Sequence, residues 1–236
     1  MNEYRLKFLE RIQRTDTVYS FRFCPCEKID FVPGQFAQVV FDEQDRNNKK
    51  LNKYLSFSCR PGKEYVELTK RFSGSDFSRR LWSLAKGEDV LLKGPMGSCT
   101  LDDQHHKVAF LIGGIGITPA ISILEHVVFS RLPCDVIMLY SNLLESDIPF
   151  RSDLDAWTNH DPSIHVVHTI VDEKPHNNSY RQGMITSEMI SCEIPDLKER
   201  IFLISGPPAM VSAMNQACRA LGCLPENIKS ENFVGY

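Results

Sequence analysis

Two different patterns of hydrophobic residues predict a chain in two parts, an antiparallel β-barrel followed by a parallel α/β domain. In the first hundred residues, short alternating segments are separated by turn pairs such as Pro33-Gly34 and Pro61-Gly62, which is typical of antiparallel barrels. From about residue 105 the apolar segments are continuous, as expected of strands covered on both faces. We place the boundary so that the barrel spans 1–102 and the α/β domain spans 103–236.

The first part contains five segments that alternate in the manner of strands and one segment with a helical pattern. Ser75 is a candidate cap for a helix that ends near Ala85, with Phe77, Leu81 and Leu84 on its apolar side. The polar segment 42–53 is expected to be a solvated loop. The predicted strands are 4–14, 18–25, 35–41, 54–59 and 65–71.

The second part alternates apolar runs with helical patterns, which predicts a parallel sheet with helical crossovers. Gly222 is well suited to end the last helix. The predicted strands are 108–112, 135–140, 164–170 and 201–205, and the predicted helices are 119–129, 148–158, 186–191 and 208–221.

Composition excludes several classes of function. The 236 residues carry a net charge of −3, which gives no reason to expect a nucleic-acid partner. The longest apolar run is interrupted by glycines and a proline, so no membrane span is predicted. The first residues lack the apolar core of a signal peptide, and we expect a cytoplasmic protein. The eight cysteines are scattered without C-x-x-C pairs, which favours reduced thiols and no metal site.

The stretch Leu111 to Pro119, "LIGGIGITP", predicts a strand, a tight turn and a helix start. Turns at the carboxyl ends of parallel strands are where open α/β sheets bind ligands, and helix N-termini suit phosphate. Gly114 and Gly116 fit the dinucleotide pattern G-x-G-x-x-G, but Pro119 occupies the place of the third glycine. Close packing of strand on helix without a ligand is the alternative. A second turn, Gly206-Pro207-Pro208, favours a nucleotide crevice.

Seven motifs occur in the order found in one flavoprotein family. The chain resembles the ferredoxin–NADP reductase superfamily, which implies a flavin-binding barrel followed by a Rossmann-like domain for a pyridine nucleotide. The resemblance covers nearly the whole chain. The motifs are "FVPGQFAQV" (31–39), "KYLSFS" (53–58), "GSDFSRRL" (74–81), "GPMGSCTL" (94–101), "GGIGITP" (113–119), "SGPPAM" (205–210) and "SENFVGY" (230–236).

This resemblance implies roles for particular residues. Ser56 would lie near flavin N5, Ser205 beside the nicotinamide, and Glu231 would orient Ser205 or the nicotinamide. Phe233 or Tyr236 would cover the flavin face that the nicotinamide must reach. The implied flavin-binding residues are Lys53, Tyr54, Leu55, Ser56, Leu68, Lys70, Gly74, Phe77 and Ser78. The implied nucleotide-binding residues are Gly113, Gly114, Gly116, Thr118, Ser141, Gly206 and Pro207, with Thr118 either a helix cap or a hydroxyl donor to the ligand.

The chain departs from the family pattern at several positions. Lys53 stands where the family usually has arginine, Leu55 where it usually has an aromatic residue, and Ser205 where many relatives have cysteine. Tyr54 points to the opposite strand face from Leu55 and is an uncertain substitute. The stretch "YSNLLESDIPFR" (140–151) has Ser141 but no basic residue directly after it, which favours NADH over NADPH.

The implied function is an FAD-dependent oxidoreductase. Hydride would pass from NADH or NADPH to bound FAD, and electrons would then pass to a separate acceptor: a ferredoxin, a flavodoxin, a haem protein or a small molecule. A basic patch for an acidic partner could be formed by Lys49, Lys50, Lys53, Arg79 and Arg80. Two alternatives are a free-flavin reductase and a non-catalytic nucleotide- or flavin-binding subunit of a larger complex.

Overall fold

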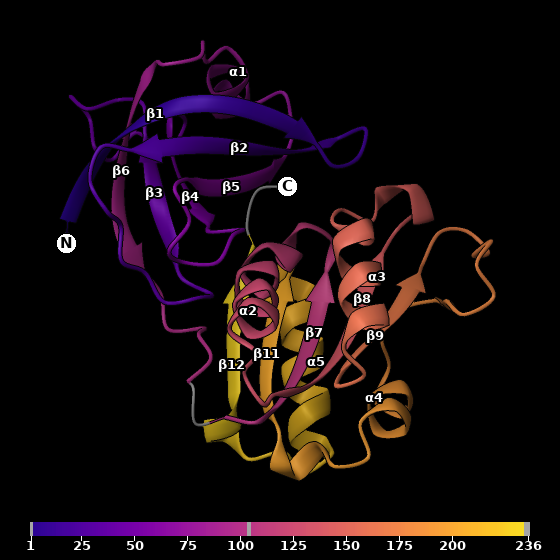
Figure 1. The fold of residues 1–236 in the computed structure, drawn as a ribbon. Helices are drawn as coiled ribbons and strands as arrows, with labels where there is room; N and C mark the ends of the chain where they lie inside the picture. The colour runs from indigo at the N-terminus through magenta and orange to yellow at the C-terminus, as the bar shows by residue number, and fades with distance from the viewer. Residues whose placement is uncertain (1, 103–104, 234–236) are drawn as a thin grey trace.

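The computed structural model describes residues 2–102 and 105–233, in two sheets (Figure 1). The first sheet has the order β4-β3-β6-β1-β2-β5, and every neighbouring pair is antiparallel. A bridge between Phe57 and Leu68 brings the end of β4 to β5. The predicted antiparallel first half is therefore confirmed. The strands are β1 (Asn2–Gln13), β2 (Val18–Pro25), β3 (Phe36–Val40), β4 (Asn52–Ser56), β5 (Val66–Arg71) and β6 (Asp89–Met96).

The helix α1 (Asp76–Trp82) covers one end of this barrel. The Ser75 hydroxyl accepts a hydrogen bond from the Ser78 amide and caps the helix, as the sequence predicts. Phe77, Leu81 and Leu84 pack into the barrel core. The helix ends before the predicted Ala85 because the chain turns at Ser83 towards β6.

The second sheet is entirely parallel, with the order β10-β9-β8-β7-β11-β12. The order reverses between β7 and β11, because β8 and β9 follow on one side of β7 and β11 and β12 on the other. Such a switch point is where ligands bind in open α/β sheets. The strands are β7 (Lys107–Gly113), β8 (Asp135–Asn142), β9 (Ile164–Ile170), β10 (Arg181–Gln182), β11 (Ile201–Gly206) and β12 (Ile228–Asn232).

Helices cover both faces of this sheet, as predicted. Residues of α2 (Ile117–Ser130) and α3 (Arg151–His160) pack on one face, and residues of α4 (Ser187–Glu193) and α5 (Pro208–Ala220) pack on the other. Short 3-10 helices occur at η1 (Gly114–Gly116), η2 (Glu145–Asp147), η3 (Leu197–Glu199) and η4 (Pro225–Asn227). Strands β6, β10 and β12 have no counterpart among the predicted elements. Within the described ranges, no helix is both long and apolar enough to span a membrane.

The two halves are joined by direct bonds between α2 and the segment after β4. The Ser122 hydroxyl donates to the Cys59 carbonyl (2.7 Å). The Glu125 carboxylate accepts from the Arg60 amide (2.7 Å) and also contacts the Lys63 ammonium. Because these bonds fix α2 against the barrel, the turn at the start of α2 also has a fixed place relative to the barrel.

Candidate functional site

The two glycine turns lie side by side at the switch point of the second sheet, after the adjacent strands β7 and β11. A Cβ atom at Gly116 would lie 2.5 Å from the Ser205 carbonyl oxygen, and one at Gly113 would collide with the Met210 sulfur. These two glycines are therefore required by close packing of one turn on the other. Close packing without a ligand, the alternative considered from the sequence, therefore explains Gly113 and Gly116.

Gly114 differs from Gly113 and Gly116. Its φ of +51° lies in the left-handed region, and no atom lies within 4 Å of the position that a Cβ would occupy. The Gly114 carbonyl accepts a hydrogen bond from the Tyr140 hydroxyl (3.0 Å), which holds the turn in place. The open side of the turn at Gly114 therefore admits close approach of a ligand backbone.

Beside these turns lie a buried serine and a half-buried glutamate. Ser205 is 2% exposed, and its hydroxyl donates to the Gly116 carbonyl (2.7 Å). Ser205 is thus oriented by the facing turn. Glu231 lies opposite Ser205 in the β11–β12 register, and burial raises the pKa of its carboxyl to about 7. A carboxyl group held in such surroundings is a common feature of functional sites.

Thr118 does not cap the helix α2. The cap is Gly116, and Thr118 lies within the first turn, where its hydroxyl donates to the Ile115 carbonyl (3.3 Å). Pro119 lies in the same turn, as the sequence predicts. Ser141 lies at the carboxyl end of β8, paired with Thr169 of β9.

On the barrel side, β4 presents two different faces. Leu55 is 6% exposed and belongs to the barrel core, so its side chain packs inside. Tyr54 is 57% exposed and makes an edge contact with Phe36, with ring centroids 5.7 Å apart. Ser56 pairs with Phe36 in the β3–β4 register and is buried. Alternation along the strand therefore puts Tyr54 and Ser56 on the same face.

Two lysines, one from β4 and one from β5, lie close to each other. Burial, together with the ammonium of Lys53, lowers the pKa of Lys70 to about 8. The Lys70 ammonium donates to the Arg71 carbonyl (3.0 Å). Two neighbouring cations, one of them buried, form a favourable environment for an anionic group.

Serine hydroxyls surround the segment that follows these lysines. The Ser78 hydroxyl lies 3.2 Å from that of Ser73 and 3.1 Å from that of Ser75. Gly74, between Ser73 and Ser75, has a positive φ of +64°. In contrast, the side chains of Phe77 and Leu68 lie fully inside the barrel core, so only their backbone groups are available to a ligand.

An apolar cluster joins the two halves of the site. Ile115, from the glycine turn, packs with Val18 of the barrel and with Phe233, which follows β12. The Phe233 amide also donates to the Gly206 carbonyl (2.9 Å), and Val18 is paired with Arg71 of β5. The glycine turn and Phe233 of the second half are thereby brought against β2 and the end of β5 in the barrel. Tyr236 lies outside the described residues.

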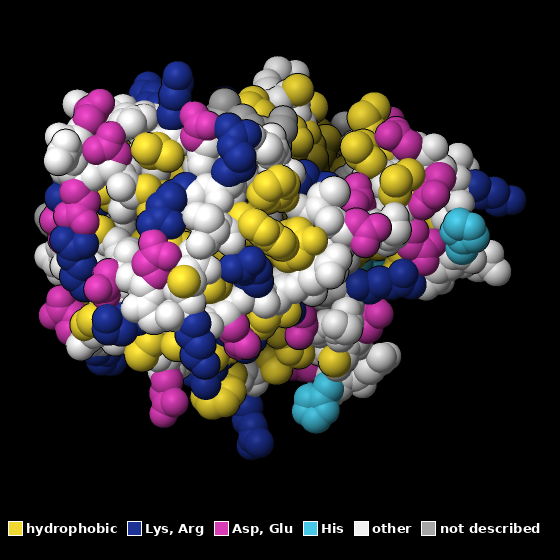
Figure 2. Space-filling model, turned by 90° about the horizontal axis from the view of Figure 1, so that it is seen from above, with side chains coloured by type: hydrophobic (Ala, Val, Ile, Leu, Met, Phe, Trp, Pro, Cys, Tyr) yellow, Lys and Arg dark blue, Asp and Glu magenta, His cyan; other side chains and the backbone are white. Residues whose placement is uncertain are grey.

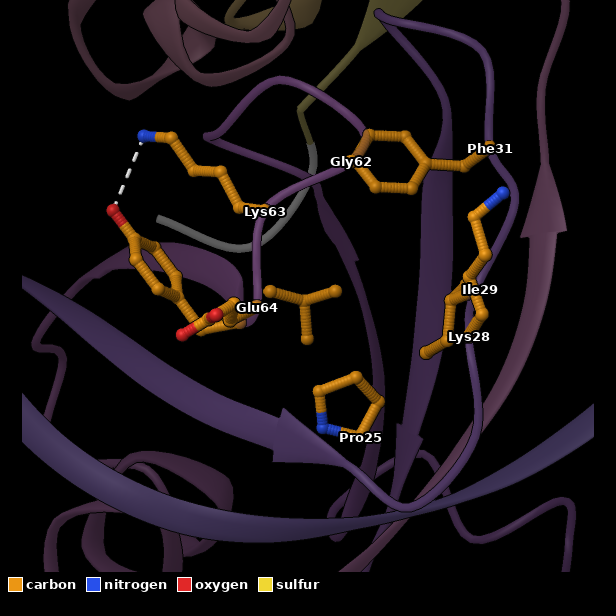
Figure 3. Close-up of a pocket in the computed structure, with 9 residues that line it drawn as sticks. Pro25, Lys28, Ile29, Phe31, Gly62, Lys63 and Glu64 are labelled. Atoms are coloured by element: carbon orange, nitrogen blue, oxygen red, sulfur yellow. Dashed lines mark hydrogen bonds between the residues drawn. The ribbon is translucent and has the colours of Figure 1, made fainter.

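A separate hollow of about 210 Å³ lies on the barrel and is shown in Figure 3. Its lining residues include Pro25, Phe31, Lys63 and Tyr65, and none of its lining residues is among those predicted for the cofactors. The Lys63 ammonium is already bonded to the Tyr65 hydroxyl (3.1 Å). We therefore place the candidate site at the interface and not in this hollow.

Comparison with known proteins agrees with this geometry. Residues 110–216 match the family model "Oxidoreductase NAD-binding domain". A ferredoxin NADP⁺ reductase from Neisseria gonorrhoeae, solved with bound FAD and NADP, has a TM-score of 0.83 and 20% sequence identity, with 98% of this chain and 99% of that chain covered. The chain therefore has the same fold as that reductase.

Two further proteins share more sequence with this chain. An NADH-cytochrome b5 reductase 1 from Scheffersomyces stipitis is 33% identical over 160 residues, which are 66% of this chain and 56% of that protein. One from Pyricularia oryzae is 27% identical over 230 residues, which are 93% of this chain and 74% of that protein. The chain therefore spans little more than half the length of the first of these relatives.

The residues present fit an FAD and a pyridine nucleotide. The lysine pair and the serine hydroxyls suit phosphate groups, and the open side of Gly114 suits a dinucleotide backbone. Buried side-chain atoms without a hydrogen-bond partner among the described residues include Thr169 Oγ1 and Glu231 Oε2, both near carboxyl ends of the second sheet. Unpaired buried polar atoms of this kind are costly unless a partner binds.

Sequence reasoning missed two groups of residues near this site. Asn142 and His168 are buried towards the carboxyl ends of β8 and β9, and burial lowers the pKa of His168 to about 4. The sequence could have pointed to Asn142 only through its position directly after the predicted Ser141. Phe72 and Trp82 flank the serine segment and are partly exposed, which only the three-dimensional arrangement shows.

Proposed function

We propose that the chain is an FAD-dependent oxidoreductase that takes hydride from NADH and passes electrons to a separate acceptor. The observation that carries the proposal is the cluster of Val18, Ile115 and Phe233. Because Val18 pairs with Arg71, the cluster sets the glycine turn beside the end of β5, between Lys70 and the serine segment. A nucleotide on this turn would therefore lie against a flavin on the barrel. In this proposal residues 1–102 bind the flavin and residues 103–236 bind the nucleotide.

Each group of residues has a separate task in the proposed reaction. Bound FAD would accept a hydride and release electrons to the acceptor, and the protein supplies position and electrostatics. Lys53 and Lys70 would neutralise the flavin phosphates, and Ser56 would donate a hydrogen bond at the edge of the flavin ring. Ser205, fixed by the Gly116 carbonyl, would border the nicotinamide. The apolar cluster would exclude water from the gap between the two rings.

Two observations support NADH as the donor. The segment after β8 carries the acidic residues Glu145 and Asp147, and an additional 2′-phosphate would be repelled there. Glu145 is already paired with Arg151 (3.0 Å) and Asp147 with Arg71 (3.5 Å), so neither of these two arginines is available to a phosphate without loss of an ion pair. The sequence relatives described above are also named for NADH.

The acceptor is proposed to be a separate protein or a small molecule. The same relatives are named for cytochrome b5, which supports a haem protein among the candidate acceptors. Of the basic residues suggested for docking, Arg79 and Arg80 are bonded to Asp76 and Glu88.

The eight cysteines are free thiols, which fits a reducing, cytoplasmic setting.

A substitution at Ser56 tests the flavin side of the proposal. We expect Ser56→Ala to slow reduction of the bound flavin about 10-fold, with FAD still bound, because only one hydrogen bond at the ring is lost. The measurement is anaerobic stopped-flow absorbance after mixing with NADH. Ser58→Ala is the matched control, since Ser58 is equally buried but its hydroxyl is bonded to Thr69 (2.6 Å). An unchanged rate in Ser56→Ala would remove this residue from the site.

A further inference from the structure

The helix α5 ends in a turn that brings two cysteines together. Gly222 follows the helix with a φ of +83°, in the left-handed region. The Cys223 amide donates to the Cys218 carbonyl (3.0 Å), and the Gly222 amide donates to the Arg219 carbonyl (3.0 Å). These two bonds define the Schellman motif, in which the first and last side chains of the turn pack on each other. Cysteine occupies both of those positions.

The two thiols of this turn are in direct contact. Cys218 is fully buried and Cys223 is 5% exposed, and both belong to the apolar cluster between α5 and the sheet. The thiols of Cys218 and Cys223 form a hydrogen bond with each other. Cys134 is also buried, but its thiol donates to a backbone group, the His105 carbonyl (3.7 Å). The end of α5 therefore carries a preformed pair of thiols.

The thiol pair lies far from the candidate functional site. The chain leaves α5 and enters β12 at Ile228, which is paired with Phe202 at the start of β11. The pair is therefore near the amino ends of the strands, at the lower end of α5 in Figure 1. Figure 2 looks onto the barrel at the other end of the molecule, where charged side chains of both signs are interspersed with hydrophobic ones. A change at the thiol pair is expected to affect stability and not the interface of the two halves.

We propose that Cys218 and Cys223 are an oxidation site at which hydrogen peroxide converts two thiols into an intrachain disulfide. The Cys223 thiolate attacks one peroxide oxygen, the O–O bond breaks, and a sulfenic acid and hydroxide are formed. The Cys218 sulfur then attacks the sulfenic sulfur, so that the S–S bond forms, the S–O bond breaks and water leaves with the Cys218 proton. The hydroxide takes up the proton first released by Cys223. Two thiols and one hydrogen peroxide thus give one disulfide and two water molecules.

The surroundings of the two thiols assign their roles. Lys198 lies over the turn, since a Cβ at Gly222 would be 3.4 Å from its Cε. Burial raises the pKa of Cys223, but the hydrogen bond from Cys218 and the ammonium of Lys198 act in the opposite direction. Burial raises the pKa of Cys218 to about 12, which suits a thiol that keeps its proton until the second step. Cys223 therefore attacks the peroxide, and Cys218 closes the disulfide.

The test is peptide mapping of the full chain after exposure to hydrogen peroxide, followed over hours because buried thiols react slowly. The remaining thiols are alkylated in denaturant before digestion. Trypsin cleaves after Arg219, so the disulfide would join the peptides 201–219 and 220–229. We expect this linked pair, lighter by two hydrogens than the sum of its parts, and its separation by dithiothreitol. The urea midpoint of the oxidised chain should rise by about 0.5–1 M, because the disulfide restricts the unfolded chain.

Two variants give the comparison. Cys223→Ala should lose both the linked peptides and the rise in the urea midpoint. Cys134→Ala is the matched control, since Cys134 is equally buried (4%), and it should keep both effects.

The peptide map of the wild type decides the proposal even if a variant fails to fold. Recovery of Cys218 and Cys223 as alkylated thiols after peroxide treatment would overturn it. Recovery of Cys223 as a sulfinic acid beside an alkylated Cys218 would also overturn it, because Cys218 would then not close the disulfide. The experiment needs no cofactor, so its outcome is independent of the proposed function.

Discussion

At the scale of single residues, the glycines after β7 serve two purposes. Gly113 and Gly116 allow the turn to pack against Met210 and Ser205, whereas Gly114 is open and has a positive φ. The motif could be read from the sequence, but this division could not, because it depends on which atoms of β11 and α5 face the turn. A glycine pattern alone therefore does not show which glycine is needed for close packing and which for binding a ligand.

Replacement of Gly114 tests its role in binding. Gly114→Ala should lower the free energy of unfolding by about 1–2 kcal/mol, the cost of a left-handed conformation for a residue with a Cβ. Gly87→Ala is the matched control, since Gly87 also has a positive φ (+85°) and open space around it. Urea denaturation should show similar losses of stability in both variants. Calorimetry should show weaker binding of NAD⁺ only in Gly114→Ala, and equal affinities in the two variants would refute a ligand at this turn.

Glu231 should make stability depend on pH. Its folded-state pKa of about 7 lies above the ordinary glutamate value, so between these two values the folded chain retains a proton that the unfolded chain has released. The stabilising contribution of this proton is complete at low pH and is lost as the pH rises through 7. Near pH 4 the wild type and Glu231→Gln should be equally stable.

At pH 8 the variant should be more stable by about 3 kcal/mol, as two to three units of pKa difference imply. Urea unfolding curves at the two pH values provide the measurement. A constant stability difference between wild type and Glu231→Gln across this range would show that Glu231 ionises normally and is not buried as described.

At the scale of elements, α2 connects the glycine turn after β7 to the barrel. Its first turn follows Gly116, and its middle carries Ser122 and Glu125, which bond to the segment after β4. One helix therefore sets both the position of the glycine turn and the spacing between the two sheets. Any shift of α2 relative to the barrel would open the gap between the proposed ring positions.

The role of α2 can be tested through Glu125. Glu125→Ala should lower the free energy of unfolding by about 1.5–3 kcal/mol, because its carboxylate accepts bonds from the Arg60 amide and the Lys63 ammonium while largely buried. Asp89→Ala provides the comparison, since the Lys7–Asp89 pair is more than half exposed and should contribute below about 1 kcal/mol. Equal losses in the two variants would mean that the contact of α2 with the barrel is only a surface pair.

The sequence predicted most elements because their hydrophobic patterns are strong. The continuous runs that became β7, β8, β9 and β11 are covered on both faces and could be recognised in isolation. Strands β10 and β12 are short, lie at the edges of the sheet and are mostly exposed or half-buried, so they have no apolar pattern to recognise. The burial of Leu55 could not be predicted from the sequence, because it depends on which face of β4 is turned towards the barrel core.

At the scale of the whole molecule, the two sheets meet where each presents the elements that we propose bind a cofactor. The switch point of the parallel sheet faces the strand pair β2–β5, and the pairs Arg71–Asp147 (3.5 Å) and Arg14–Asp153 (3.4 Å) also cross the interface. The motifs proposed for the two cofactors lie in separate halves of the sequence. The contacts between the halves are the basis of the proposed hydride transfer.

The most direct test of that transfer is anaerobic reduction of the FAD-loaded chain. On addition of NADH, the absorbance band of oxidised flavin should disappear in a single turnover, and NADPH should act more slowly because of Glu145 and Asp147. A candidate acceptor such as a cytochrome b5 should then restore the band. If the band persists with both nucleotides while FAD remains bound, the two cofactors do not meet at this interface and the central proposal is wrong.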